Sequence, residues 1–189
     1  ASLTGNGLAN ILYAGAGNAT LIGAAGNDNL LGGAGGDVLD GGSGADTLSG
    51  SDGNDYYFID NVGDQVVESN AGVAGGNDVV YSALAAYTLG ANVEIGRIVA
   101  SGAASLTGNT LANLLYTGSG NGTLNGAAGN DNLIGSAGVD VLDGGSGADS
   151  LSGGDGNDYY FVDNVGDVVV ESNAGVAGGN DVVYSALAA

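Results

Sequence analysis

The chain has 189 residues and a formal net charge of −20, with Arg97 as its only base and no His or Cys. This charge argues against binding to nucleic acid or to an anionic membrane surface. The absence of His and Cys from the sequence excludes His-based triads, His-ligated zinc and thiol chemistry. Forty glycines argue against long helices, and no apolar run reaches the ~20 residues of a membrane span.

From residue 5 to residue 58 the sequence repeats in nine-residue blocks, the clearest of which are GAAGNDNLL, GGAGGDVLD, GGSGADTLS and GSDGNDYYF. The first six residues of a block suit a sharp turn, because glycine adopts positive φ without steric cost. The last three suit a short strand whose apolar eighth position points inward. Two blocks then complete one coil of about eighteen residues, which predicts an all-β parallel β-solenoid.

The sixth position of the block carries a recurring acid. Asp28 should lie over Asp46, and Asp37 over Asp55, on coils about 4.8 Å apart. Two carboxylates about 5 Å apart repel by roughly 3 kcal/mol at an effective dielectric of about 20, so a cation is expected between them. Ca²⁺ suits this place because it takes about six to eight oxygen ligands in flexible geometry. Local turn formation alone would not hold the acid at one position in consecutive blocks. The ligands predicted here are Asp28, Asp37, Asp46, Asp55 and Asp64.

The flanking blocks depart from this pattern. In residues 5–22, Asn10 and Ala19 replace the acid, which predicts partial or empty metal sites. The block IDNVGDQVV keeps Asp64 but loses the glycines. Residues 68–77, ESNAGVAGGN, break the frame and are predicted to form a surface loop. The β-branched runs DVVYSAL and VEIGRIVA are predicted strands.

The chain also repeats at longer range. Residues 1–86 align with residues 104–189 at a constant shift of 103 and differ at 13 of 86 positions, none of them an inward eighth position. This predicts a first unit at 1–103, with a nonapeptide core at 5–67 and a loop and strands at 68–103, and a second, truncated unit at 104–189 with its core at 108–170. The second core adds the predicted ligands Asp131, Asp140, Asp149, Asp158 and Asp167.

Neither end of the chain resembles the polar cap that covers the end of a natural solenoid. We therefore expect either an excerpt from a longer array or a subunit whose ends are covered by the next molecule.

The remaining acids lie outside the sixth position of the block. Asp52 and Asp155 could each add a metal ligand, but we expect them to stay solvated, and we expect Asp40 and Asp143 to be surface charges. Some of those in the irregular segments could form a further calcium site: Asp60, Glu68, Asp78, Asp163, Glu171 and Asp181. Paired carboxylates can hydrolyse glycosides, but no aromatic-lined cleft is evident, so we expect no enzyme activity.

The blocks at 23–58 and 126–161 resemble those of the RTX, or haemolysin-type calcium-binding, family of secreted bacterial proteins, with weaker likeness at 5–22 and 108–125. DYYFIDNVGDQVVE, GGNDVVYSALAAYTLGANVE and SLTGNGLANILY resemble the segments that link blocks in long members. The resemblance implies a right-handed parallel β-roll with calcium-binding Gly-Asp turns and calcium-triggered folding. It also implies export by a type I secretion system to an extracellular or cell-surface location.

Two functions fit these features. The first is a calcium-stabilised structural solenoid in a bacterial surface fibre, surface layer or long adhesin shaft, with self-association or end-to-end stacking into a polymer. The alternative is the non-catalytic calcium-binding tail of a type I-secreted enzyme or toxin. The near-identical units favour the first.

Overall fold

The computed structural model describes residues 1–69, 75–171 and 178–187. These residues form short β-strands joined by turns and contain no helix, and hence no helix that could cross a membrane. The chain divides into two compact units, one of residues 1–84 with 90–93, the other of residues 85–89 with 94–189. The predicted all-β parallel solenoid is confirmed in each unit, while the domain boundaries read from the sequence repeat stay a prediction.

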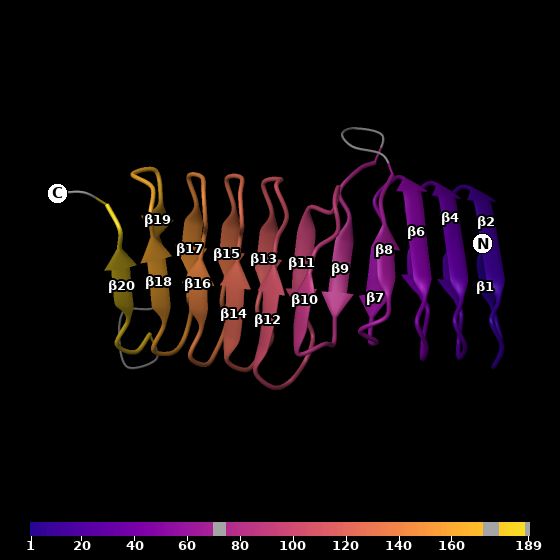
Figure 1. Ribbon diagram of the computed structural model, residues 1–189, viewed down its shortest axis with the longest axis horizontal. Helices are drawn as coiled ribbons and strands as arrows, with labels where there is room; N and C mark the ends of the chain where they lie inside the picture. Colours follow the sequence, from indigo (N-terminus) through magenta and orange to yellow (C-terminus); the bar gives the residue numbers. More distant parts are fainter. Residues whose placement is uncertain (70–74, 172–177, 188–189) are drawn as a thin grey trace. The chain divides into compact units, whose positions relative to one another are not determined.

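In the first unit, two series of parallel strands alternate along the chain, as Figure 1 shows. One series pairs in the order β1, β3, β5, β7, β9 and the other in the order β2, β4, β6, β8. The strands are β1 (Ser2–Thr4), β2 (Ile11–Ala16), β3 (Thr20–Ile22), β4 (Asn29–Ala34), β5 (Val38–Asp40), β6 (Thr47–Asp52), β7 (Tyr56–Ile59), β8 (Gln65–Val67) and β9 (Val79–Ser82).

The second unit repeats this arrangement. One parallel series runs β10, β12, β14, β16, β18, β20 and the other β11, β13, β15, β17, β19. The strands are β10 (Ala86–Thr88), β11 (Ile95–Ile98), β12 (Ala104–Thr107), β13 (Leu114–Tyr116), β14 (Gly122–Asn125), β15 (Asn132–Ile134), β16 (Val141–Asp143), β17 (Ser150–Ser152), β18 (Tyr159–Val162), β19 (Val168–Val169) and β20 (Val182–Ser185).

The strand register confirms the predicted coil length, because Leu30 pairs with Leu12 on one side and with Leu48 on the other. The side chain of Tyr57 is fully buried, whereas its neighbours Tyr56 and Phe58 are each 41% exposed. Side chains therefore alternate between the inside and the outside of the solenoid along each strand, and the inward ones form the core. The inward positions with no exposed surface include Leu21, Leu30, Leu39, Leu48, Leu124, Leu133, Leu142, Leu151 and Tyr160.

In each unit one coil is longer than the others, and the parallel pairing resumes after it. Tyr57 in β7 pairs with Val80 in β9, and Tyr160 in β18 pairs with Val183 in β20, both at a separation five residues longer than a normal coil. The predicted surface loop at 68–77 is corrected in part: residues 70–74 lie outside the described residues, but Glu68 is buried.

Candidate metal centre

The sixth-position residues stack in columns along each unit. In the first unit, Asn10, Asp28, Asp46 and Asp64 form one column. In the second, Asn113, Asp131, Asp149 and Asp167 form its equivalent. Eight of the ten predicted ligands are at most 2% exposed, and Asp64 and Asp167 are half-buried.

A backbone hydrogen bond joins each residue of a column to the acid on the next coil. The N–H of Asp28 donates to Oδ1 of Asp46, and the N–H of Asp37 donates to Oδ1 of Asp55, both at 2.7 Å. The N–H of Asp131 does the same to Oδ1 of Asp149 at 2.7 Å. One oxygen of each carboxylate is thus paired with a backbone donor, which offsets part of the predicted repulsion and ties the register of the coils to the acids.

The second carboxylate oxygen is the unusual feature of these columns. In seven of the ten predicted ligands, Oδ2 is buried and accepts no hydrogen bond from the described residues. A buried charge without a partner is costly. Burial accordingly raises the pKa of Asp55 and of Asp131 to about 6, although a backbone N–H stabilises each charge. The seven acids with a spare oxygen are Asp28, Asp37, Asp46, Asp55, Asp131, Asp149 and Asp158.

The glycine that begins each turn keeps a space open beside the spare oxygen. A Cβ added to Gly23 would collide with Oδ2 of Asp28 and with the carbonyl oxygen of Gly41 on the next coil. A Cβ on Gly126 would collide with the equivalent atoms of Asp131 and Gly144. Carboxylate and carbonyl oxygens therefore border one small space, and these hard donors are the ligands that Ca²⁺ prefers. The residues present fit a calcium ion.

The second residue of the turn decides whether an acid keeps its spare oxygen. Ala24 and Gly42, which precede Asp28 and Asp46, have φ of 84° and 74°. In this left-handed conformation the N–H of Gly42 donates to the side chain of Asp40, two residues before it, rather than to Asp46. Glycine adopts such a φ freely, whereas Ala24 does so at a steric cost. This backbone conformation turns the N–H away and leaves Oδ2 of Asp28 and of Asp46 free for a ligand.

Three predicted ligands lie in turns of another kind. The N–H groups of Asp60 and Asn61 both donate to Oδ2 of Asp64, at 3.2 and 3.0 Å, and the equivalent groups donate to Asp167. The N–H of Ser136 donates to Oδ2 of Asp140 at 3.0 Å. These carboxylates cap their own turns, so both of their oxygens already accept hydrogen bonds.

Asp140 differs from its first-unit counterpart Asp37 because two neighbouring residues differ. Ser136 stands at the position of Gly33, and it does not have the positive φ of 100° that Gly33 has. Thr117 replaces an alanine on the preceding coil, and its hydroxyl lies 3.4 Å from Oδ2 of Asp140. The Ser136 N–H and the Thr117 hydroxyl thus bond to Oδ2 of Asp140, whereas Oδ2 of Asp37 in the first unit has no such partner.

The sequence prediction missed one acid of the column in each unit. The N–H of Asp55 donates to Oδ1 of Asp78 at 2.8 Å, and the N–H of Asp158 donates to Oδ1 of Asp181 at 2.9 Å. Both acids continue a column beyond the interrupted frame. The available signal was the run GGNDVVY, whose turn and strand positions match those of DGNDYYF.

A family model described as RTX calcium-binding nonapeptide repeat (4 copies) matches residues 4–39, 31–65, 107–142, 116–151 and 134–169. Together these segments cover more than half of the chain and contain all ten predicted ligands. No curated protein matches the chain.

Proposed function

The chain belongs to the RTX calcium-binding nonapeptide repeat family, and we propose that this calcium-binding protein serves as an extracellular structural solenoid. Its place would be a bacterial surface fibre, a surface layer or a long adhesin shaft. Calcium, when bound, supplies positive charge between buried carboxylates. The chain itself supplies length, through stacked coils, and a fixed register, through the N–H bonds between successive acids.

The observation that carries this proposal is the repetition of one unit. Two segments that differ at 13 of 86 positions build the same series of parallel strands and the same columns of acids. A solenoid gains stability from neighbouring repeats, so adding units extends it without adding a new kind of site. Such repetition suits a structural element better than a tail that serves only export.

The acids also support a non-catalytic role. Every predicted ligand accepts a backbone hydrogen bond at Oδ1 from the preceding coil, which fixes its orientation within a column. A general acid or base must instead reach a substrate. The buried carboxylates at Asp37 and Asp46 are placed to hold coils together.

Calcium would also control when the chain folds. The acid columns come together only in the folded state, so calcium bound there stabilises folding. At low calcium, the net charge of −20 opposes compaction. A chain kept unfolded in the cell and folded by external calcium suits secretion as an extended thread.

Electron microscopy of the cells that make the intact protein tests the proposal, with gold-labelled antibodies against this segment. We expect label on surface fibres or on a surface layer, and loss of that order when a chelator removes calcium. Label confined to a released enzyme or toxin that carries the segment beside a catalytic domain would overturn the structural role and establish the export tail.

A further inference from the structure

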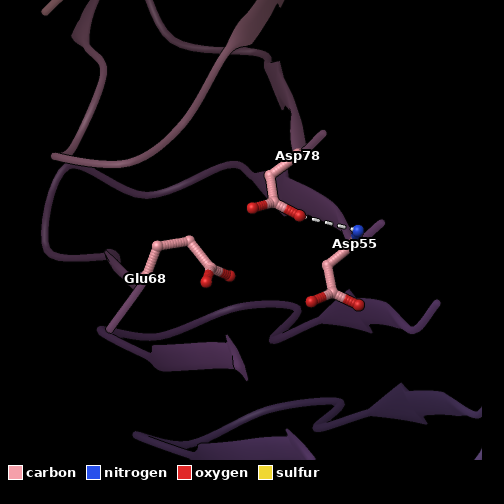
Figure 2. A group of neighbouring side chains, drawn as sticks. All are labelled: Asp55, Glu68 and Asp78. Carbon is pink, nitrogen blue, oxygen red and sulfur yellow. Dashed lines mark hydrogen bonds between the residues drawn. The ribbon is translucent and has the colours of Figure 1, made fainter. Parts of the chain in front are cut away.

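Three acids from different parts of the first unit meet at the point where the nine-residue frame is interrupted. Asp55 precedes β7, Glu68 follows β8 and Asp78 precedes β9. They are 0%, 7% and 1% exposed. One carboxylate oxygen of each lies within 4.8 Å of the other two. Figure 2 shows the three carboxylates turned toward one another.

The hydrogen bonds around this cluster hold the carboxylates in place without neutralising them. The N–H of Asp55 donates to Oδ1 of Asp78, the bond drawn in Figure 2. The hydroxyl of Tyr57 donates to Oε1 of Glu68, and the side-chain amide of Asn92 donates to the Glu68 carbonyl oxygen at 3.1 Å. Glu68 is therefore fixed on both its backbone and its side chain.

A second observation points to a ligand. Oδ2 of Asp55 is buried and accepts no hydrogen bond from the described residues. The sequence has a single Lys or Arg, Arg97, and its guanidinium lies over the ring of Tyr116, 3.8 Å from the ring centroid. Three converging buried carboxylates, one with an unpaired oxygen, favour a cation between them.

We propose that Asp55, Glu68 and Asp78 bind a calcium ion at a junction site, of which the regular nine-residue repeat supplies only Asp55. Three carboxylates offer the hard, charged oxygens that Ca²⁺ takes in flexible geometry. Glu68 lies outside the sixth-position columns, and Asp78 follows Asp55 by 23 residues rather than 18. The ion would fasten the end of β8 and the start of β9 to the turn before β7, at the place where the regular coil is lost.

The second unit repeats the junction with its own residues. Asp158, Glu171 and Asp181 also bring ligand atoms within 4.8 Å of one another. The hydroxyl of Tyr160 donates to Glu171, and Oδ2 of Asp158 is buried without a hydrogen bond from the described residues. Glu171 is more exposed than Glu68. The same chemistry at both junctions predicts two such ions in this chain.

Isothermal titration with Ca²⁺ tests the site on the whole chain. Glu68→Gln combined with Glu171→Gln keeps the side-chain volume and an acceptor for each tyrosine hydroxyl, and it removes one charge per junction. We expect this variant to bind two fewer calcium ions, or to bind two of them at least about tenfold more weakly. The matched control is Asp40→Asn with Asp143→Asn, which removes two charges outside the clusters, keeps the acceptors of the Gly42 and Gly145 N–H groups and should bind as the wild type does.

Terbium luminescence gives a second readout that does not depend on the Gln variant folding. Tb³⁺ replaces Ca²⁺ at oxygen sites and is excited by a nearby tyrosine, and Tyr57 and Tyr160 contact the junction glutamates. Tyr57→Phe with Tyr160→Phe should lower the tyrosine-excited emission while leaving the number of bound ions unchanged. Wild-type ion number and affinities in the Gln variant, or unchanged emission in the Phe variant, would overturn the proposal. Either result would leave the structural role of the solenoid standing.

Discussion

Replacing Asp46 by asparagine separates the two tasks of a column acid. Asparagine keeps Oδ1 as the acceptor for the Asp28 N–H, a bond of 2.7 Å, and removes the charge at the spare Oδ2. Asp40→Asn is the matched control. Asp40 occupies the outward ninth position, and its Oδ1 accepts only the N–H of Gly42 at 3.0 Å. Asparagine preserves that acceptor too, so both variants lose one charge and keep their backbone bond.

The surroundings of Asp46 determine how Asp46→Asn should change the stability without calcium and the calcium midpoint of folding. Burial, and then the charges of neighbouring acids including Asp64 and Asp28, raise the pKa of Asp46. Each facing pair repels by up to roughly 3 kcal/mol at 5 Å and an effective dielectric of about 20. Asp46→Asn should therefore stabilise the folded chain when calcium is absent. With calcium, a lost carboxylate ligand should raise the calcium midpoint at least about tenfold, or about 1.4 kcal/mol.

Far-UV circular dichroism during a calcium titration measures both effects. We expect Asp46→Asn to need more calcium than the wild type to reach half of its β signal. In chelator, this variant should show at least as much β signal as the wild type. Asp40→Asn should behave as the wild type does in both conditions. Equal midpoints for the two variants would refute the assignment of columns. A smaller β signal in chelator for Asp46→Asn would refute the argument that its charge opposes folding.

Three further outcomes follow from the same geometry. Removing calcium from the wild-type chain should abolish most of its β signal, and a full β spectrum in excess chelator would contradict this. The folded-state pKa of Asp55 and of Asp131, about 6, exceeds the ordinary value of 3.8. These two acids therefore stabilise the calcium-free fold fully below about pH 4, and that contribution is lost as pH rises through about 6. Scattering in chelator should show a more compact chain at pH 4 than at pH 7, and the reverse trend would count against it. Thr117→Ala with Ser136→Gly should free Oδ2 of Asp140 and add one bound calcium ion in equilibrium dialysis, whereas an unchanged ion number would show that these residues do not block a site.

Reading the repeat alone gave the correct frame for the central blocks. Leu30 and Leu48 are buried and paired, and Asp28 is bonded to Asp46, as a coil of two blocks requires. These features follow from local spacing, because a turn of fixed length and a strand of alternating side chains repeat wherever the block repeats. The repeat did not place Asp78 in a column, because an insertion of five residues shifts the frame between β7 and β9.

The period, the inward apolar positions and the column of each repeated acid all follow from the sequence. Which carboxylate oxygens remain available for an ion depends on the folded structure. That choice depends on the backbone φ at the second turn residue and on donors from an adjacent coil, as Thr117 and Ser136 show at Asp140. It also depends on segments that are distant in the sequence, since the fold brings the carboxylate of Glu68 near that of Asp55. A regular spacing in the sequence determines which acids stack on one another. What each carboxylate oxygen bonds to depends on the N–H and hydroxyl donors that surround it in the folded chain.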